Sequence, residues 1–284
     1  MTTITASAVK ELREVTGVAM MDCKKALVET NGNMEEAKDF LRKKGQAKAL
    51  KKSSRETREG AVGFSAHKDG KTAGIVQVTC ETDFVARNEK FKEFLNKLAE
   101  QVSVNGENDL LKQNLINGQG NVGGMLTDTI AELGENIQIL NSRKFKINHG
   151  LIGGYVHSNG KIGVAVPLET DQPCNDERLK SLAKDIAMHI AAFQAEAVKP
   201  EQVPEEVLEK EKEVFTAQAK ESGKPDNIIE QMIEGRLKKY VKEICVESQP
   251  FVKDPQFSVS QILEKTAKEL GVEINFEKFE KYQF

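Results

Sequence analysis

The chain has 284 residues, of which 41 are lysine or arginine and 44 are aspartate or glutamate, so its formal net charge is −3. This length allows two or three domains with cores of their own. The nearly balanced charge argues against a general nucleic-acid-binding protein, which typically has a strong excess of basic residues. We therefore expect no direct binding of nucleic acid.

The cysteine pattern and the apolar runs indicate the compartment. Cys23, Cys80, Cys174 and Cys245 lie far apart and form no C-x-x-C motif, which disfavours disulfides and zinc and fits a reducing cytosol. The start of the chain lacks a basic and then apolar signal segment. The apolar runs stay well short of the ~20 residues that span a bilayer. We expect a soluble, cytoplasmic protein that does not enter a membrane.

Residues 4–48 show three short helical patterns. The first ends at Gly17, the second starts near Met20 or Met21 and stops at Gly32, and the third ends at Gly45. Three helices of this length predict a small bundle with a thin core, similar to the ubiquitin-associated type of domain. Apolar residues at helical spacing are expected to face inward: Val9, Leu12, Val15, Cys23, Ala26, Leu27, Val28, Ala37, Phe40 and Leu41.

Met20 and Met21 can be interpreted in two ways. Methionine usually fills a core, and we expect this for at least one of the two. Alternatively, the pair forms a flexible apolar patch that grips a helix of a partner, with Lys24 at its rim one turn later. The basic and polar residues 46–59 that follow the bundle are predicted to form a solvated linker.

A repeat of roughly 90 residues organises the rest of the chain. Strand-like runs flank a hairpin turn at Lys68–Lys71, and an amphipathic helix follows with Asn88 as its N-cap. The same features return from Gly150 onward, and the sequence Glu-Thr-Asp at 81–83 is matched by Glu-Thr-Asp at 169–171. Each repeat is therefore predicted to be one hairpin plus one helix.

The stretch between strand and helix in the first repeat differs from its counterpart in the second repeat. It places Asp83 and Phe84 on a short, tight corner, whereas the aligned position of the second repeat holds Gln172. The corner can therefore form without an aromatic residue. Local packing of Phe84 and contact with a partner are both open, and the comparison of the repeats favours a side chain that reaches outward.

The segment between the repeats contains a glycine-rich motif. Gly118–Gly123 formally matches G-x-G-x-x-G, but no strand pattern precedes it and no suitable acidic residue follows. A glycine-rich loop is favoured over a dinucleotide site. A helix is predicted from Met125 to Leu133 with a stop at Gly134, followed by strands at 137–140 and 144–147.

The C-terminal third begins with two charged helices. Residues 201–244 predict an antiparallel helical hairpin of coiled-coil type, broken at Gly223-Lys224-Pro225 and inserted into the core. A helix from Val259 to Leu270, capped by Gly271, and an edge strand at Val272–Phe276 in the second sheet are predicted to return the chain to the core.

Together these elements predict an α+β fold with a duplicated core. We divide the chain into an N-terminal three-helix domain with linker (1–55), a first core subdomain (56–145), a second core subdomain (146–200 and 245–284) and the inserted helical hairpin (201–244).

The sequence carries no recognisable catalytic motif. It contains no G-x-x-x-x-G-K-[ST], no G-x-S-x-G, no H-E-x-x-H and no metal-ligand spacing. His157 belongs to a predicted hairpin turn without a nearby nucleophile, so catalysis by it is not expected. We expect a protein that is no enzyme and that needs neither a cofactor nor a metal.

Two motifs resemble the elongation factor Ts family. They are residues 81–88, Glu-Thr-Asp-Phe-Val-Ala-Arg-Asn, and the N-terminal run 12–17 with 20–27. They occur in the right order, and the resemblance covers nearly the whole chain. It implies a translation elongation factor that exchanges guanine nucleotide on its partner, elongation factor Tu.

The resemblance also implies which residues touch that partner. The Asp83-Phe84 pair, flanked by Thr82 and Val85, would enter the GTPase domain, and the aromatic ring would wedge between two helices beside the magnesium and phosphate site. Further contacts carried over by position are Met20, Met21, Lys24, Leu133, Gly134, His157 and Val252. Lys253 departs from the family pattern, which puts that neighbouring contact in doubt.

Two other classes of protein remain as alternatives. The first is a non-enzymatic adaptor whose N-terminal bundle binds helical or ubiquitin-like partners while the core serves as scaffold. The second is a dinucleotide-binding enzyme, which rests on the glycine motif alone. Phe84 discriminates between the first alternative and an exchange factor, because a scaffold does not need it.

Overall fold

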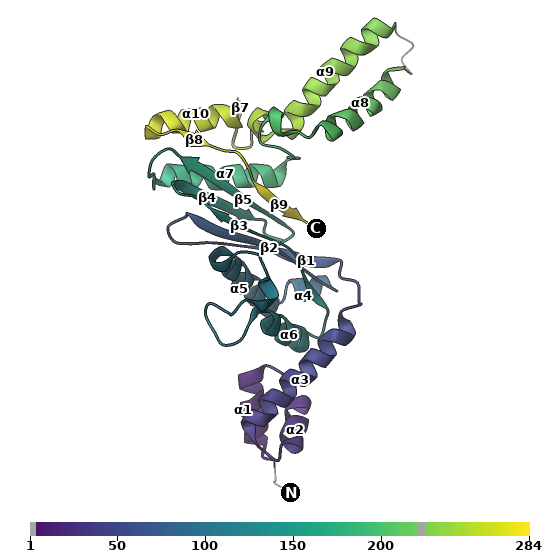
Figure 1. Ribbon diagram of the computed structural model, residues 1–284, viewed down its shortest axis with the longest axis vertical. Coiled ribbons are helices and arrows are strands. Elements are labelled where there is room, and N and C mark those ends of the chain that lie inside the picture. The colour runs from purple at the N-terminus through teal and green to yellow at the C-terminus, as the bar shows by residue number, and fades with distance from the viewer. Residues whose placement is uncertain (1–3, 221–224) are drawn as a thin grey trace.

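The computed structural model describes residues 4–220 and 225–284 of the chain. Its parts follow one another along the longest axis of the molecule: a helical bundle, a core of two sheets between helices, and a projecting helical arm (Figure 1). The predicted α+β class is confirmed, with N-terminal helices followed by antiparallel sheets and helices.

The N-terminal bundle consists of three helices: α1 (Ala6–Thr16), α2 (Met20–Glu29) and α3 (Met34–Lys52). Asn33 caps α3 by accepting hydrogen bonds from two amides of its first turn, and Gly17 ends α1 with a positive φ of 68°. The bundle core is small, as expected, and its buried members are Val9, Leu12, Cys23, Ala26, Leu27, Ala37 and Leu41. Val15 and Val28 are exposed instead of inward.

Helix α3 continues to Lys52, so the prediction that it ends at Gly45 is wrong. A glycine inside a helix costs about 1 kcal/mol relative to alanine, which is why the sequence indicated a stop. Gly45 is buried, however, and a Cβ placed on it would lie 3.4 Å from the Cβ of Ala131 in a helix of the core. Packing of α3 against α6 at this point accompanies the continuation of the helix past Gly45, so the linker starts only after Lys52.

The first sheet is antiparallel, with strand order β1-β2-β3, and helices cover its outer face. Its strands are β1 (Glu59–Ala66), β2 (Thr72–Cys80) and β3 (Ile137–Lys146). The helices that accompany it are the one-turn α4 (Asp83–Ala86), α5 (Glu89–Asn105) and α6 (Val122–Leu133), with a short 3₁₀ turn at Leu110–Lys112.

The second sheet has the same design. Its strands are β4 (Gly150–Val156), β5 (Ile162–Thr170), β8 (Ile274–Asn275) and β9 (Glu280–Gln283), and the last two both pair with β5. Its outer face is covered by α7 (Glu177–Ala192) and α10 (Val259–Leu270), and the small ribbon of β6 (Pro250–Phe251) and β7 (Asp254–Ser258) precedes α10.

The two sheets pack face to face, with helices on both outer sides (Figure 1). Side chains of both sheets form the central layer, among them Val62, Ile75, Phe145, Ile152 and Tyr282. Strands β2 and β5 are buried along almost their whole length. Both of their faces are covered, so their sequences read as continuous apolar runs.

The hairpins of the two repeats match with an offset of 90 residues. Gly60 pairs with Thr79 in the first repeat, and Gly150 pairs with Glu169 in the second. Each hairpin turn also reaches the first strand of the other repeat. The amide of Val62 donates to the carbonyl of Gly160 in the second hairpin turn over 2.8 Å. The amide of Ile152 donates to the carbonyl of Gly70 in the first hairpin turn, also over 2.8 Å. Such reciprocal contacts are those of a two-fold arrangement.

The shared Glu-Thr-Asp sequences are not structurally equivalent, which corrects the alignment of the repeats. Glu169 occupies in β5 the place of Thr79 in β2, two residues before Glu81. The true equivalent of Glu81 is Asp171. Both carboxylates accept a hydrogen bond from the loop amide that follows the second helix of their repeat, over 2.7 Å and 2.9 Å respectively.

The corrected alignment changes the residue that stands in the place of Phe84. It is Cys174 instead of Gln172, and residues 171–176 run as bends and irregular backbone up to α7. The second repeat therefore has neither the aromatic residue nor the one-turn helix that carries it. The inference that the corner can be built without an aromatic residue survives the correction.

The duplication extends further than the sequence analysis recognised. Helix α10 repeats α6 with an offset of 137 residues, down to the glycine that ends each, Gly134 and Gly271. Strand β3 is likewise repeated by β8 and β9 together: Ile137 pairs with Cys80, and Ile274 pairs with Thr170. The predicted strand at 272–276 is confirmed only for Ile274–Asn275.

Strand β9 was missed because the chain leaves the sheet between its two halves. Its signal was nevertheless present, since Lys-Tyr-Gln-Phe at 281–284 repeats the alternation of Lys-Phe-Lys-Ile at 144–147. Tyr282 and Phe145 take equivalent places in the central layer.

The arm is inserted between α7 and α10. Helices α8 (Glu205–Lys220) and α9 (Asp226–Ile244) run antiparallel, which confirms the predicted hairpin. Gly223 and Lys224 of the predicted break lie outside the described residues, and Pro225 directly precedes α9. None of the helices in the described ranges combines the length and the apolar character needed to cross a bilayer.

Candidate functional site: the Phe84 corner

The Phe84 corner, residues 81–88, connects β2 to α5 through the one-turn helix α4. The hydroxyl of Thr82 accepts a hydrogen bond from the amide of Val85 over 3.4 Å, and the side chain of Asn88 accepts one from the amide of Lys90 over 2.9 Å. Two N-caps within seven residues fix the direction of the chain on both sides of α4. The side chain of Phe84 is 82% exposed, so it does not pack locally.

Glu135 holds the corner from the loop after α6. One of its carboxylate oxygens accepts hydrogen bonds from the amides of Glu81 (3.1 Å) and Thr82 (3.0 Å), and the other accepts one from the hydroxyl of Thr82 (2.7 Å). Hydrogen bonds to a charged acceptor are stronger than neutral ones. The corner is therefore anchored on the loop after α6 and not only on its own strand.

Sequence analysis missed Glu135. The signal that identifies it is the second offset of the duplication, which aligns Gly134 with Gly271 and hence Glu135 with Val272. The second repeat thus lacks the carboxylate where it also lacks the one-turn helix.

The linker after α3 is fastened to the same place. The carboxylate of Glu81 accepts a hydrogen bond from the amide of Asn136 over 2.7 Å and forms an ion pair with Arg55 over 3.4 Å. The side-chain amide of Asn136 in turn donates to the carbonyl of Arg55 over 2.7 Å. These contacts tie the N-terminal bundle, the α6 loop and the corner together.

Two polar side chains near Glu135 differ in exposure: the carboxylate of Asp83 is partly exposed and the thiol of Cys80 is buried. Asp83 is partly exposed and forms an ion pair with Arg87 one turn later, over 3.1 Å. The thiol of Cys80 is buried and donates to the carbonyl of Thr82 over 3.1 Å. Burial raises the pKa of Cys80 to about 12, and the carboxylate of Glu135 adds to that shift. Cys80 is therefore an uncharged, structural thiol at neutral pH.

Leu133 and Gly134 lie beside the corner, as one surface with it. Leu133 and Val85 both pack against the core cluster under the first sheet. Gly134 ends α6 with a positive φ of 80°, and its amide donates to the carbonyl of Ile130. This turn places Glu135 directly under the corner, so the tertiary structure brings together residues that are about 50 positions apart in the sequence.

Met20, Met21 and Lys24 lie on the exposed side of α2. The two methionines are 49% and 64% exposed, so the expectation that at least one of them fills the core is wrong. The turn before α2 lies against α6: a Cβ placed on Gly17 would be 2.9 Å from a carboxylate oxygen of Glu132. The start of α2 is therefore close to the end of α6 that carries the corner loop.

His157 is exposed at the β4–β5 turn, where its Nδ1 lies 2.8 Å from the hydroxyl of Tyr155. The turn contacts the start of β1, because Lys161 forms an ion pair with Glu59 over 2.6 Å. Glu59 pairs with Cys80 at the end of β2. His157 is therefore on the side of the core from which the Phe84 corner extends.

Val252 has different neighbours. It is half-buried between β6 and β7, and its amide donates to Nδ1 of the buried His189 on α7 over 3.2 Å. The next residue, Lys253, forms an ion pair with Asp185 of the same helix over 2.7 Å. Of the predicted positions, Val252 is the one whose contacts connect it to α7 instead of to the corner.

The glycine-rich motif is a loop before α6, as predicted. Residues 116 and 117 form a turn, residues 118–120 form bends, and Asn121 caps α6 by accepting from the amide of Gly124 over 2.8 Å. Within residues 4–220 and 225–284, no group of three histidine, cysteine, aspartate or glutamate side chains is arranged to hold a metal ion.

The fold and the site define the class of protein. An exposed aromatic side chain on a corner held by caps and a charged acceptor is the geometry of an anchor in a protein–protein interface. The chain is thus a protein that acts by contact with another protein.

Comparison with known proteins supplies the family. The family model described as Elongation factor TS matches residues 81–283. The chain is 45% identical to Elongation factor Ts of Clostridium novyi (strain NT), over 99% of this chain and 92% of that protein. It is 43% identical to Elongation factor Ts of Lawsonia intracellularis (strain PHE/MN1-00), over 99% and 98%. The protein of the same name from Nitratidesulfovibrio vulgaris (strain DP4) is 44% identical, over 99% and 95%.

The chain belongs to the elongation factor Ts family. It is accordingly a nucleotide exchange factor for elongation factor Tu in translation elongation and not a catalytic enzyme. This confirms the resemblance and removes the dinucleotide-binding enzyme as an alternative.

Proposed function

We propose that the chain binds elongation factor Tu directly and promotes GDP release by inserting Asp83 and Phe84 into its GTPase domain. The observation that carries this proposal is the 82% exposure of Phe84 on a corner held by three hydrogen bonds to Glu135. An aromatic anchor that is ordered before binding loses little conformational entropy on docking. The ring would wedge beside the magnesium and phosphate site of the partner and disturb it.

Exchange by this route requires no catalytic group on the chain. The factor has to bind the nucleotide-free partner more tightly than the nucleotide-bound one. By linkage, the factor lowers the partner's affinity for the nucleotide by the same ratio by which the nucleotide lowers its affinity for the factor. The wedge provides the difference, because it competes with the geometry that holds Mg²⁺ and the phosphates.

The remaining interface is proposed to follow the side of the molecule that carries the corner. It would include Met20, Met21 and Lys24 on α2, together with Leu133 and Gly134. The contacts between the α1–α2 turn and α6, and between the α6 loop and the corner, support a continuous surface. His157 and Val252 would extend this surface along the second repeat.

The bundle would be of the ubiquitin-associated type, and the chain would divide into the units 1–55, 56–145, 146–200 with 245–284, and 201–244. The protein would work in the cytoplasm. The exposed methionines would also suit the adaptor alternative, but an adaptor leaves the anchored Phe84 without a role.

The test is the release of a fluorescent GDP analogue from elongation factor Tu, with the wild type and with Phe84→Ala. The loss of an interface anchor typically costs 2 kcal/mol or more, which lowers the acceleration by about 30-fold. Phe257→Ala removes a 38% exposed ring from β7 and is the matched control, expected to retain full activity. Equal acceleration by wild type and Phe84→Ala would contradict the wedge.

A further inference from the structure

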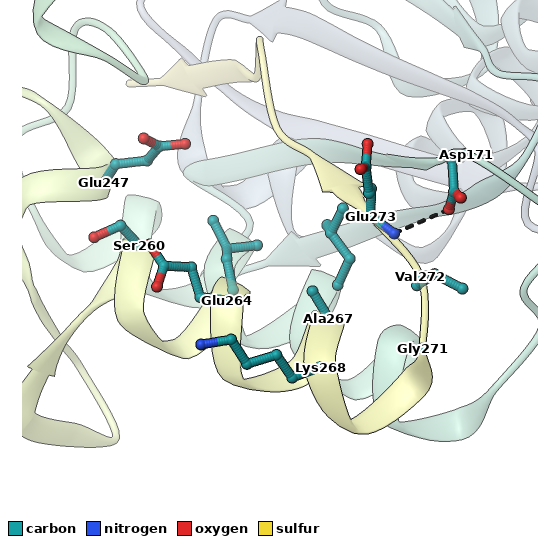
Figure 2. Close-up of a pocket in the computed structure, with 11 residues that line it drawn as sticks. Asp171, Glu247, Ser260, Glu264, Ala267, Lys268, Gly271, Val272 and Glu273 are labelled. Carbon is teal, nitrogen blue, oxygen red and sulfur yellow. Dashed lines mark hydrogen bonds between the residues drawn. The ribbon is translucent and has the colours of Figure 1, made fainter.

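The second repeat contains an open groove, the C-terminal groove, between α10 and the chain that enters β8. It has a volume of about 640 Å³. Figure 2 shows Ser260, Glu264 and Lys268 along α10, Glu247 across from them, and Asp171 bonded to the amide of Glu273 at the far end. The side chains of Glu264, Lys268 and Glu273 are exposed.

In the first repeat, the end of the corresponding place that is nearest to Gly134 is covered by the chain itself. The equivalents of Lys268 and Gly271 are Ala131 and Gly134, and α3 lies on both: Gly45 faces Ala131, and the ammonium group of Lys52 lies 3.9 Å from a Cβ placed on Gly134.

The linker after α3 extends this cover. Arg55 forms an ion pair with Glu81, the equivalent of Asp171, over 3.4 Å, and its carbonyl accepts from the side chain of Asn136. Asn136 is only 2% exposed as a result, whereas its equivalent, Glu273, is exposed. The basic end of a helix and the extended residues after it thus cover in the first repeat what is open in the second.

The charge of the groove indicates what it accepts. Four carboxylates line it, from Asp171, Glu247, Glu264 and Glu273, against the single ammonium group of Lys268. Burial raises the pKa of Glu247, and although nearby Lys199 opposes this shift, the surrounding carboxylates, Glu264 among them, reinforce it. A cationic occupant would relieve this repulsion, as Arg55 neutralises Glu81 in the first repeat.

We propose that the C-terminal groove binds the basic C-terminal end of a helix from another protein. The occupant would have lysine or arginine in the last turn of its helix and an arginine a few residues later, the pattern of Lys51, Lys52 and Arg55 in this chain. The arginine would pair with Asp171, and the helix would lie along Ser260, Glu264 and Lys268.

A labelled peptide with the sequence of residues 38–57 is the probe, because this segment covers the end of the equivalent place in the first repeat. It is titrated against the full chain by fluorescence anisotropy. We expect saturable binding that shifts the amide resonances of Gly271 and Glu273. The double variant Glu247→Lys/Glu264→Lys should bind the peptide at least about tenfold more weakly than the wild type. A higher salt concentration should also weaken binding of the peptide to the wild type, because salt screens part of the attraction.

A charge-matched double variant on the arm, Glu206→Lys/Glu213→Lys, changes the net charge equally and should bind the peptide like the wild type, because both side chains are exposed on α8. Thermal unfolding of both double variants checks that they are folded.

Three outcomes would overturn the proposal. They are the lack of saturable binding, an equal loss in the two double variants, and a self-association of the chain that Glu264→Lys abolishes, since the occupant would then be a second copy of the chain.

Discussion

The two repeats have the same scaffold, yet only the first one carries an exposed aromatic side chain, Phe84, on its corner. Both present a strand end, a following corner and a loop amide that donates to the acidic residue of that corner. In the first repeat, Thr82 caps a one-turn helix and Glu135 accepts from the corner amides. In the second repeat, Gln172 and Val272 stand in these places, and the chain runs without a helix to α7.

The difference teaches that exposure of an aromatic side chain has to be supported by polar contacts beneath it. A one-turn helix has too few internal hydrogen bonds to be stable by itself, so its amides need other acceptors. Thr82 and Glu135 provide these acceptors. The scaffold of the duplicated core is shared, whereas the function depends on a few polar residues under one corner.

A second difference concerns what covers each repeat. In the first repeat α3 and the linker lie on α6, and in the second repeat the arm is inserted before α10 while the C-terminal groove stays open. The duplicated positions thus provide internal controls for experiments on either repeat.

The largest expected effect comes from the glycines under the helices. A Cβ on Gly153 would lie 2.4 Å from the carbonyl carbon of Ala183, whereas a Cβ on Gly63 would lie 2.8 Å from Cγ of Leu95 and 3.1 Å from the carbonyl oxygen of that residue, which is a milder clash. We expect Gly153→Ala to lower the free energy of unfolding by about 3 kcal/mol and Gly63→Ala by about 1 kcal/mol. Denaturant unfolding measures both, and equal losses would show that the two helix contacts are alike.

The next effect is that of Glu135→Val, which installs the residue of the second repeat. The amides of Glu81 and Thr82 and the hydroxyl of Thr82 would lose their acceptor, at a cost of about 2 kcal/mol. We expect the corner to loosen and the acceleration of GDP release to fall at least tenfold. Glu135→Gln keeps an acceptor oxygen and should be intermediate, so a variant Glu135→Val with wild-type exchange would refute the anchoring role.

A smaller effect is expected for Thr82→Ala. The substitution removes the cap of α4 and one of the three hydrogen bonds to Glu135, and the loss of a cap costs about 1 kcal/mol. GDP release should slow by a few-fold, less than in Glu135→Val. Thr170→Ala changes a threonine at the end of β5 in the other repeat and should leave exchange unaltered. Thr170 caps no helix, so equal slowing by the two variants would show that the effect of Thr82→Ala does not result from the lost cap.

The smallest effect is a pH dependence in the second repeat. Burial lowers the pKa of His189, although its hydrogen bond to Gln249 opposes the shift, and Nδ1 accepts from the amide of Val252. The rings of Phe193 and Phe251 lie beside it. Because the folded pKa is below the unfolded one, the unfolded state takes up the proton first. Stability should be full above pH 6.5 and fall as the pH is lowered from there.

Denaturant unfolding between pH 7.5 and 5.5 tests this sign. His189→Gln should have a lower stability at pH 7.5 and a weaker dependence on pH over this range than the wild type. An unchanged slope in the variant would assign the pH dependence to other groups.

Much of the local structure was predictable because its causes are local. The caps at Asn33 and Asn88 and the stops at Gly17, Gly134 and Gly271 occur where the side-chain chemistry of each residue demands. The hairpin turns were predictable for the same reason. The corner itself was found from its neighbours in sequence and from the comparison of the repeats.

The parts that were mistaken depend on residues far away in the chain. Gly45 reads as a helix stop, but the close approach of α3 to Ala131 outweighs its low helix propensity. Met20 and Met21 read as core, but the bundle fills its small core with other side chains. The sequence pattern makes Glu169 the equivalent of Glu81, and only the register of β4 with β5 shows that the two repeats are shifted by two residues at this point.

The sequence by itself determined the class of the fold, the order of its helices and hairpins, and, through two motifs, the family. Periodicity and capping act over a few residues and are therefore legible in a single chain. Only the tertiary structure decided that Glu135 supports Phe84, that β9 joins the second sheet, and that α3 and the linker cover a place whose equivalent in the second repeat is open. These features result from strand pairing and helix packing between distant residues.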